Sequence, residues 1–435
     1  MDLLIKLGQF ILIISILVVL HEFGHYLPAK LFGTRVEKFF LFFDYKFAIY
    51  KKKIGDTVFG IGWLPLGGYV KISGMIDESM DKAQMEGPVQ PWEFRAKPAW
   101  QRLIIMIGGV VVNFLLSWVI YSCMLFNYGA SYVPASGNGV VPDELGTRIG
   151  FKYNDEILSI DDAPIKTFMD ARFGIAVGDK VTVLRAGKKH NIHLTAAHKK
   201  EIFEDNSISF IRPKLTSHIG FVQEDSFAQN LGLKVGDKIL TANGKSMDSW
   251  GSWIAEIKAS KGDTLKFTMQ RPDNSIKKHQ LYLPKEALLG VSPDYKKIMV
   301  TDNYGVFASI TGGFSKTTKV LTDQVRQFKV ILNPKTEAYK KVSGPVGMVN
   351  MMPTSWNAQF FWQFLAMLSV WLAFVNILPI PALDGGHVMF LLYEVIARKK
   401  PNQRIVEYGQ VLGFIILMSL MLLIFGNDIW NVFIK

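Results

Sequence analysis

Two histidines and a glutamate stand close together near the start of the chain. His21, Glu22 and His25 form the pattern His-Glu-x-x-His within VVLHEFGHYLPAK, residues 18–30. Positions i and i+4 of a helix share one face, so both imidazoles can meet a single metal ion. Neutral imidazoles suit zinc, and a neighbouring carboxylate can take a proton from a water activated by the metal. The spacing therefore indicates one Zn²⁺ between the histidines, with Glu22 as the general base.

A third ligand is absent from this motif, and a second motif far along the chain offers one. NILPIPALDGGHVMF, residues 376–390, interrupts an apolar segment with two prolines, two glycines and one carboxylate, Asp384. Two histidines and a carboxylate, with water in the fourth position, make an open catalytic zinc site. The alternative is a helix-breaking loop in which the aspartate only caps a helix. Taken with the first motif, the zinc interpretation is the stronger one.

The elements that must position these groups are membrane-spanning helices. Four apolar segments each reach the roughly 20 residues that a spanning helix needs. They are residues 4–27, 100–126, 360–395 and 405–433. An ionisable group within a span costs roughly 2.5–3.5 kcal/mol or more, so such groups are rarely without function. The first segment is not interpreted as a signal peptide, because HEFGH stands where a small-residue cleavage site should be.

The net charge of +12 reflects topology rather than nucleic-acid binding. Basic residues gather in the connection after the first apolar segment and in the short connection between the last two, which contains Arg398, Lys399, Lys400 and Arg404. By the positive-inside rule both connections face the cytoplasm, so the region from about 130 to 355 lies on the other side. The single cysteine, Cys123, rules out an internal disulfide and a cysteine-based zinc site.

Residues 57–72, TVFGIGWLPLGGYVKI, are apolar but too short and too broken for a spanning helix. They predict a membrane-associated β-hairpin or re-entrant strand, which persists at membrane depth only when buried in protein or lining a cavity. The exposed edge of such a hairpin can pair with an extended peptide by strand addition. Gly67 and Gly68 are candidate substrate-binding positions on this segment.

The central region contains an internal repeat. Residues 150–165 align with residues 232–247, and residues 177–187 align with residues 261–271. Each copy combines a Gly-Asp or Asn-Asp turn with short alternating strands, which predicts two small β-rich domains. The copies resemble bacterial PDZ domains, the second more closely. That likeness implies capture of a peptide or a C-terminus by strand addition. The alternative is two generic β-rich domains.

Several motifs together carry a family resemblance. HEFGH, LPLGGYVKI, the paired β-rich domains, SGPVG at residues 343–347 and NILPIPALDGGH occur in this order through nearly the whole chain. The chain thereby resembles the site-2 protease family of intramembrane zinc metalloproteases, of the bacterial RseP (regulator of sigma-E protease) type. The resemblance implies zinc-dependent cleavage of a transmembrane helix, with His21, His25 and Asp384 as ligands and Glu22 as the base.

The resemblance implies substrate contacts as well. Asn376 and Pro379 match an Asn-x-x-Pro element that holds unwound substrate, with Pro381 following, and Asn113 in GGVVVNF matches an asparagine of the second span. The chain departs from the family where Gly108-Gly109 replaces the usual Gly-Pro and where LFFDY replaces a Gly-Phe-Gly strand. His387 is interpreted as a neighbour of the site rather than a ligand, and the histidines of the central region as surface residues.

The implied substrates are single-pass membrane proteins. An anti-sigma factor already trimmed by another protease and a remnant signal peptide both fit this class. The implied location is the lipid bilayer of the bacterial inner membrane, with periplasmic PDZ domains and an active site toward the cytoplasmic side. A catalytically inactive PDZ-bearing scaffold is an alternative, against which the intact Glu22 argues. An ion transporter is another, but the four apolar segments show no inverted repeat.

The expected fold is a multi-span α-helical membrane protein, with four transmembrane helices and a membrane-associated β-hairpin, plus tandem β-rich PDZ domains. Residues 1–128 form an N-terminal membrane part with the hairpin at about 57–72. Two PDZ-like domains follow at residues 129–210 and 211–295. An amphipathic connector occupies residues 296–355, and residues 356–435 form a C-terminal membrane part.

Overall fold

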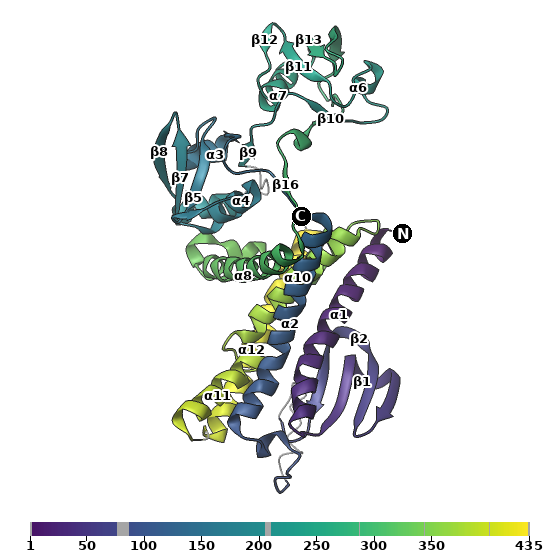
Figure 1. The fold of residues 1–435 in the computed structure, drawn as a ribbon, viewed down its shortest axis with the longest axis vertical. Helices are drawn as coiled ribbons and strands as arrows, with labels where there is room; N and C mark the ends of the chain where they lie inside the picture. Colours follow the sequence, from purple (N-terminus) through teal and green to yellow (C-terminus); the bar gives the residue numbers. More distant parts are fainter. Residues whose placement is uncertain are drawn as a thin grey trace. The chain divides into compact units, whose positions relative to one another are not determined.

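The computed structural model describes residues 2–75, 87–204, 210–286, 288–342, 344–399 and 401–433. The chain divides into two compact units (Figure 1). The membrane unit comprises residues 1–129, 303–328 and 339–435, and the β unit comprises residues 130–302 and 329–338. Ser343 of the SGPVG motif and Lys400 of the basic connection lie outside the described residues.

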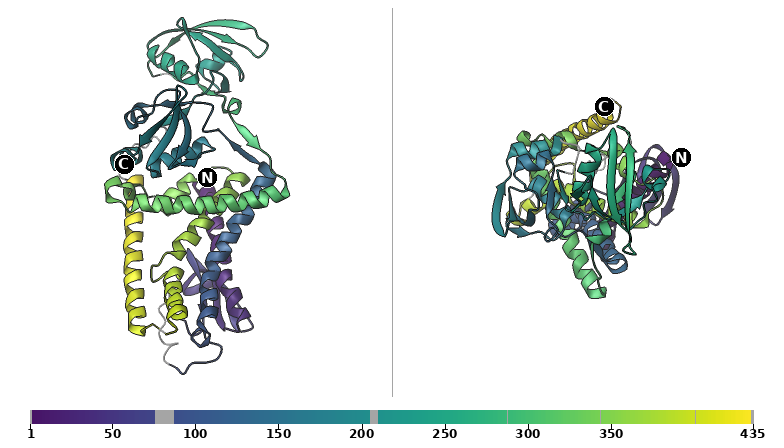
Figure 2. Two further views of the ribbon diagram at one scale, coloured as in Figure 1. Left: turned by 60° about the vertical axis from the view of Figure 1, so that its left-hand side comes forward. Right: turned by 90° about the horizontal axis from the view of Figure 1, so that it is seen from above.

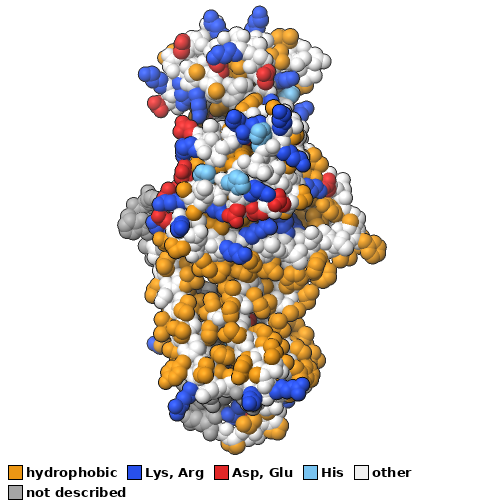
Figure 3. Space-filling model, turned by 90° about the vertical axis from the view of Figure 1, so that its left-hand side faces the viewer, with side chains coloured by type: hydrophobic (Ala, Val, Ile, Leu, Met, Phe, Trp, Pro, Cys, Tyr) orange, Lys and Arg blue, Asp and Glu red, His pale blue; other side chains and the backbone are white. Residues whose placement is uncertain are grey.

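Among the described residues, four helices of the membrane unit are long and apolar enough to cross a bilayer. They are α1 (Asp2–Leu31), α2 (Ala99–Tyr128), α10 (Ala358–Ile377) and α12 (Gln403–Phe433). Leu, Ile and Val side chains such as Leu12, Val119 and Leu422 are exposed on them, and Figure 3 shows hydrophobic side chains along this unit with Lys and Arg gathered at one end. An apolar exposed face suits lipid. The prediction of four spans is confirmed.

The third apolar segment is split in two. α10 ends at Ile377, and α11 (Asp384–Ala397) begins after a six-residue loop. Pro379 and Pro381 have no amide hydrogen to donate, so the helix cannot continue through them. Within the loop, Ile380 N donates to Leu378 O at 2.7 Å. The segment expected at 360–395 is therefore one span and a short helix, and the break leaves Asp384 as the first residue of α11.

Glycines and polar contacts hold the helices together. A Cβ on Gly24 of α1 or on Gly108 of α2 would overlap the other residue's carbonyl oxygen, so the two backbones touch at this point. Ser369 Oγ of α10 donates to Asn113 O of α2 at 2.7 Å. Arg102 of α2 pairs with Glu394 of α11 at 2.6 Å. These contacts fix α1, α10 and α11 around α2.

The membrane-associated hairpin is longer than the expected residues 57–72. Those residues form one strand, β2 (Thr57–Ile72), and the partner is β1 (Val36–Ile54), of which the sequence indicated only LFFDY, residues 41–45, as a strand. β1 residues 38–41 pair with two parts of β2, residues 58–61 and 68–71. Residues 58–61 pair in turn with residues 50–53. The segment 68–71 therefore lies at an edge of the folded hairpin.

The β unit contains two four-stranded sheets of the same topology, β6-β5-β7-β8 and β12-β11-β13-β14. In each sheet the strand in second place, β5 or β11, is the first long strand of its copy. It forms a short hairpin with β6 or β12, and one helix follows that hairpin. The bounds in the first copy are β5 (Glu156–Ile160), β6 (Ala163–Pro164), α4 (Phe168–Val177), β7 (Lys180–Arg185) and β8 (Lys188–His193). In the second they are β11 (Lys238–Ala242), β12 (Lys245–Ser246), α7 (Trp250–Ala259), β13 (Asp263–Gln270) and β14 (Ile276–Leu283).

Shorter strands complete both copies in equivalent ways. β4 (Val140–Pro142) pairs with β9 (Ile211–Pro213), and β10 (Ile219–Val222) pairs with β15 (Val291–Pro293). β3 (Ala130–Tyr132) and β16 (Val300–Asp302) pair where the chain enters and leaves the unit. Each copy has its own apolar core, around Phe151 and Ile175 in one and around Trp253 and Phe267 in the other. The repeat seen in the sequence is thus a repeat of structure.

Two further helices belong to the return of the chain into the membrane unit. α8 (Val306–Ile331) lies within the connector expected at residues 296–355, and its residues 306–328 belong to this unit. The Trp118 indole of α2 donates to Ile310 O of α8 at 2.8 Å, and a Cβ on Gly313 would overlap Ser122. α8 runs across the spans in Figure 2. The short α9 (Pro345–Met351) leads to α10.

Candidate metal centre

The two histidines of the first motif face one point from consecutive turns of α1. His21 and His25 are both buried, with exposed fractions of 8% and 7%. Their Nε2 atoms lie 3.4 Å apart, with the rings perpendicular to one another. The i, i+4 spacing on a continuous helix produces this arrangement, as the sequence predicted.

Asp384 completes the group from the other end of the chain. Its Oδ2 lies 3.4 Å from His21 Nε2 and 3.3 Å from His25 Nε2. The loop before α11 makes the approach possible, because Gly385 and Gly386 leave room for the backbone of residues 377–381. Within the described residues these three form the one group of His, Cys, Asp or Glu side chains that could hold a metal ion.

The geometry of the three side chains fits zinc. Ligand atoms about 2.0–2.1 Å from a tetrahedral zinc ion lie about 3.3–3.4 Å from one another. The three separations measured here are 3.4, 3.4 and 3.3 Å. Asp384 Oδ2 is buried and makes no hydrogen bond within the part of the chain that the structure describes. A buried carboxylate oxygen without a partner is costly, and a bound cation would remove that cost.

Both imidazoles are oriented by groups of α2. His25 Nδ1 lies 2.9 Å from the backbone oxygen of Ile105, so this nitrogen carries the proton and Nε2 keeps its lone pair. His21 Nδ1 lies 3.0 Å from the Asn113 amide, whose Nδ2 is placed toward it. Asn113 is fully buried, and its Oδ1 has no partner among the described residues. Rotating the amide by 180° lets Oδ1 accept the proton that His21 Nδ1 carries when Nε2 binds metal.

Gly109 supplies the space that the site needs. A Cβ at this position would lie 2.4 Å from His25 Nε2 and 2.6 Å from His21 Cε1. The pair Gly108-Gly109 therefore serves two purposes, since Gly108 admits the backbone of α1 and Gly109 admits the imidazoles. The sequence marked this pair only as a departure from the family pattern.

Glu22 lies beside the metal-ligand candidates and beside the hairpin. Its carboxylate is within electrostatic range of His21, His25 and Asp384, and it faces the backbone N–H of Val70. A Cβ on Gly68 would meet Val18 Cγ1 of α1 at 2.5 Å, which places the edge segment 68–71 along this helix. Gly67 precedes it with a φ of 152°. The hairpin edge thus runs past the site.

The remaining candidates come from the end of α10 and the loop after it. Asn376 Nδ2 lies 3.2 Å from His21 Nε2, so this amide borders the group of ligand candidates. Pro379 and Pro381 lie in the loop that joins Asn376 to Asp384. His387 lies one turn into α11 and is not one of the grouped ligand candidates. The Ile105 carbonyl was not predicted, because a backbone oxygen leaves no mark in the sequence.

Comparison with known proteins decides the family. The model of peptidase family M50 matches residues 9–420. The chain belongs to peptidase family M50. A zinc metalloprotease of Neisseria meningitidis is 29% identical over 97% of this chain and 98% of its own length. Protease RseP of Yersinia pestis is 27% identical over 98% of this chain and 99% of its own, and the regulator of sigma-E protease RseP of Escherichia coli is 25% identical over 97% and 98%.

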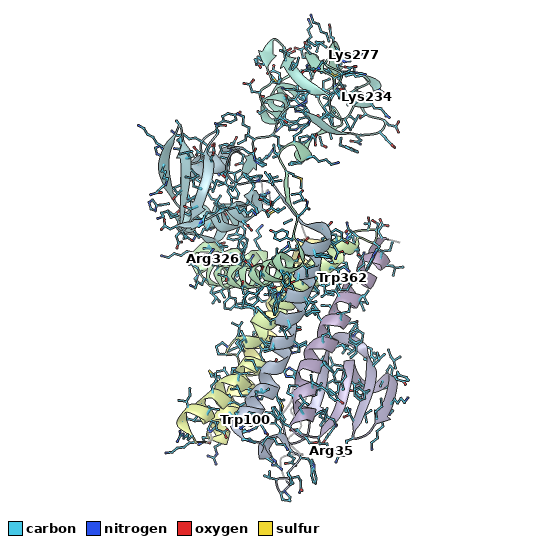
Figure 4. The ribbon with its side chains drawn as sticks, viewed as in Figure 1. Arg35, Trp100, Lys234, Lys277, Arg326 and Trp362 are labelled. Atoms are coloured by element: carbon cyan, nitrogen blue, oxygen red, sulfur yellow. The ribbon has the colours of Figure 1, made fainter. Side chains whose placement is uncertain are left out.

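This M50 chain is therefore a zinc-dependent metalloprotease of the site-2 protease type, and the family resemblance seen in the sequence is confirmed. Its four apolar helices fit proteolysis within a membrane, and its bacterial relatives fit the inner membrane. Figure 4 places Arg35 and Trp100 at one end of the spans and Trp362 toward the other. Tryptophan is enriched at both faces of a bilayer, so Trp100 and Trp362 mark the two interfaces.

Proposed function

We propose that His21, His25 and Asp384 hold the zinc ion and that Glu22 is the general base for hydrolysis of a peptide bond in or near a transmembrane helix. The observation that supports this most directly is the set of three ligand-atom separations, each 3.3–3.4 Å, around a buried Asp384 oxygen to which no described residue donates a hydrogen bond. Zinc bound there would polarise the scissile carbonyl and acidify a water molecule.

The protein groups around this point have distinct tasks in the proposal. Glu22 takes the proton of the attacking water and can pass it to the leaving amine. The Ile105 carbonyl and the Asn113 amide keep the two imidazoles in the tautomer that binds metal. Asn376 donates its amide hydrogens to the carbonyl oxygen of the bond that is cut, because its Nδ2 already lies 3.2 Å from His21 Nε2.

The hairpin edge and the proline loop hold the substrate in the same proposal. A helix that unwinds in lipid exposes backbone groups that need partners. Segment 68–71 has a strand partner on one side only within the described register, and Gly67 and Gly68 keep its approach free of side chains. Pro379 and Pro381 hold the loop open beside Asn376, since neither can join a helix. The unwound strand would pair with this edge.

The relatives suggest the biological substrates. Several of them are named as regulators of sigma E. We propose that this chain likewise cuts single-pass membrane proteins, such as an anti-sigma factor trimmed by another protease or a remnant signal peptide. The β-rich copies at 129–210 and 211–295 are proposed to be periplasmic PDZ domains. The connector at 296–355 would then lead back to a site near the cytoplasmic side, where the basic connections lie.

A reporter with one transmembrane helix and a short ectodomain tests this function. The native chain and Glu22→Gln are compared in vesicles, and the zinc content of both purified proteins is measured. We expect cleavage by the native chain alone and one zinc per chain in both proteins. Cleavage by Glu22→Gln at the native rate would refute the role of the base. Zinc in both proteins without cleavage by either would instead favour the inactive scaffold.

A further inference from the structure

The last span, α12, packs against few other parts of the membrane unit. Of the most apolar stretch of α12, 6% is buried, whereas the corresponding figure for α10 is 50%. In the left view of Figure 2, α12 stands as a separate upright helix at one side of the membrane unit. Few side-chain contacts hold such a helix in place, so individual anchors matter more for its position.

One anchor is a buried carboxylate near the end of α12. Asp428 has an exposed fraction of 4%. Its Oδ1 accepts the N–H of Gly344 at 2.9 Å, and its Oδ2 accepts those of Val346 at 3.0 Å and Gly347 at 3.3 Å. These amides belong to the SGPVG motif and the first turn of α9, whose N–H groups have no partner within the helix. A carboxylate is the strongest acceptor for such amides.

Gly344 allows the carboxylate to come this close. Its φ of −95° is open to any residue, so the requirement is one of space rather than of backbone conformation. A Cβ here would lie 2.6 Å from Ile424 Cγ2 and 2.7 Å from Asp428 Oδ2. The glycine of SGPVG is thus matched to a carboxylate 84 residues further along the chain.

The other end of α9 is fixed to the first span. Lys6 Nζ donates to Asn350 O at 3.1 Å, and Gln9 Nε2 donates to Pro353 O at 2.9 Å. Gln9 is buried, with an exposed fraction of 5%. α9 therefore links α1, which carries the His-Glu-x-x-His motif, to α12 through Asp428.

The middle of α12 touches the loop that leads to Asp384. A Cβ on Gly413 would overlap the carbonyl group of Pro381. One turn earlier, a Cβ on Gly409 would lie 3.3 Å from Phe390 Cζ and 3.6 Å from Pro381 Cγ. Any sideways movement of α12 would change the support of this loop, because the helix backbone meets it without an intervening side chain.

We propose that Asp428 is a positioning residue for the protease. Its bonds to the SGPVG backbone hold α12 against Pro381, and α12 in turn holds the loop between Asn376 and Asp384. This inference rests on the proposed function of that loop, because the effect on cleavage is transmitted through the metal ligand and the amide at its two ends.

Asp428→Asn and Gly344→Ala break the same contact from opposite sides. The asparagine turns an NH₂ group toward backbone N–H groups in either orientation, and the alanine pushes Ile424 and Asp428 away. Asp225→Asn is the matched control, since that carboxylate is exposed and its oxygens accept no hydrogen bond from the described residues. The full chain and each variant are reconstituted in lipid nanodiscs.

Hydrogen–deuterium exchange is read for the peptides that cover residues 344–347 and 378–384, beside reporter cleavage. We expect faster exchange in both peptides for both variants and about a tenfold loss of cleavage, the size expected for lost hydrogen bonds to a charged group. The double variant should be no worse than either single one, because both remove one contact. The Asp225→Asn chain should match the native chain in every measurement.

The inference is overturned if exchange rises at 344–347 while residues 378–384 and cleavage stay at native values, since Asp428 would then be only a local helix cap. Additive losses in the double variant would also overturn it. The exchange measurement is repeated in Glu22→Gln, which separates the two hypotheses. If Glu22→Gln cuts the reporter, the proposed function fails, yet the exchange pattern of the Asp428 variants still tests the contact.

Discussion

The membrane unit and the β unit each hold an aspartate that faces basic side chains, but they hold it in different ways. In the β unit, Asp155 is fully buried and accepts two hydrogen bonds of 2.7 Å from Arg185 and one of 2.8 Å from Lys152 N. In the membrane unit, Asp384 Oδ2 lies between two imidazoles and accepts no hydrogen bond from the described residues. The first arrangement is complete by itself, whereas the second would be completed by the zinc ion proposed to bind there.

The second β copy offers an intermediate case. Asp237 corresponds to Asp155 and also accepts a backbone hydrogen bond, from Lys234 N at 2.8 Å. Arg271 Nη2 bonds to Gly232 O at 2.9 Å, just as Arg185 Nη2 bonds to Gly150 O at 2.8 Å. Yet Asp237 Oδ1 and Arg271 Nε have no partner within the described part of the chain. An unpaired buried oxygen alone is therefore no sign of a metal site, which also requires converging ligand atoms.

The largest effect is expected from Asp384→Ala. Removing one of three proposed ligands from a site with an open position should abolish both zinc retention and reporter cleavage, because two imidazoles alone hold zinc weakly. Zinc per chain is measured after dialysis, with thermal unfolding as the check on folding. The matched variant Asp155→Ala should keep its zinc. Full zinc occupancy in Asp384→Ala would rule out the proposed ligand.

The two β copies should differ when their aspartates are replaced. Asp155→Asn breaks a bidentate pair with Arg185 and should lower the free energy of unfolding by about 3 kcal/mol. Asp237→Asn loses one backbone hydrogen bond at most, so about 1 kcal/mol or less is expected. The two changes in the free energy of unfolding are measured by chemical unfolding of the full chain, with proteolysis of the β unit as the readout. Equal losses would show that the second pair closes in solution.

Much of the site could be predicted from the sequence, because each of its two motifs is recognisable from its own residue types and spacing, although the motifs lie far apart in the chain. The helical spacing of His21 and His25 specified a shared face, and the proline-interrupted motif pointed to Asp384. The partners that orient the imidazoles were harder to predict. Asn113 was known only through the family resemblance, and the Ile105 carbonyl belongs to a residue whose side chain has no bearing on its role.

The fold was predicted less evenly. Four spans and a β repeat follow from hydrophobicity and internal alignment, and the structure contains both. β1 was predicted only in part, at LFFDY, because its lysines suggested a cytoplasmic connection, whereas Lys51, Lys52 and Lys53 are exposed positions of a paired strand. The contact of SGPVG with Asp428 was also missed, since it joins a backbone turn to a carboxylate in another helix.

A smaller effect should separate two buried polar residues on α2. Asn113→Ala removes the group that orients His21 and should weaken zinc binding about 10- to 100-fold. Ser117→Ala is the matched control, because this serine is equally buried and its Oγ has no partner among the described residues. Zinc affinity is measured by competition with a chelating dye. Similar losses in both variants would indicate a packing defect rather than orientation of the ligand.

The smallest expected effect concerns pH and the second β copy. His279 was predicted to be a surface residue, but its ring stacks on Phe267 with centroids 5.2 Å apart. Burial lowers the pKa of His279, and the nearby charges of Arg271 and Lys277 lower it further. The unfolded chain then binds the proton more tightly than the folded one. The contribution of His279 to stability is therefore present above the unfolded pKa of about 6.5 and is lost as pH falls through the folded value.

Unfolding of the second copy should consequently become easier between pH 7 and pH 5, as monitored by tryptophan fluorescence, because Trp253 is fully buried in this core. His279→Gln should flatten the dependence, since the amide keeps polarity and does not titrate. His198→Gln, in the first copy, should leave it unchanged. The first copy has no such stacked histidine among its described residues, so its stability should vary less over this range. If His279→Gln retains the full pH dependence, another group must take up the proton, and His218 is the next to test, because burial also lowers its pKa.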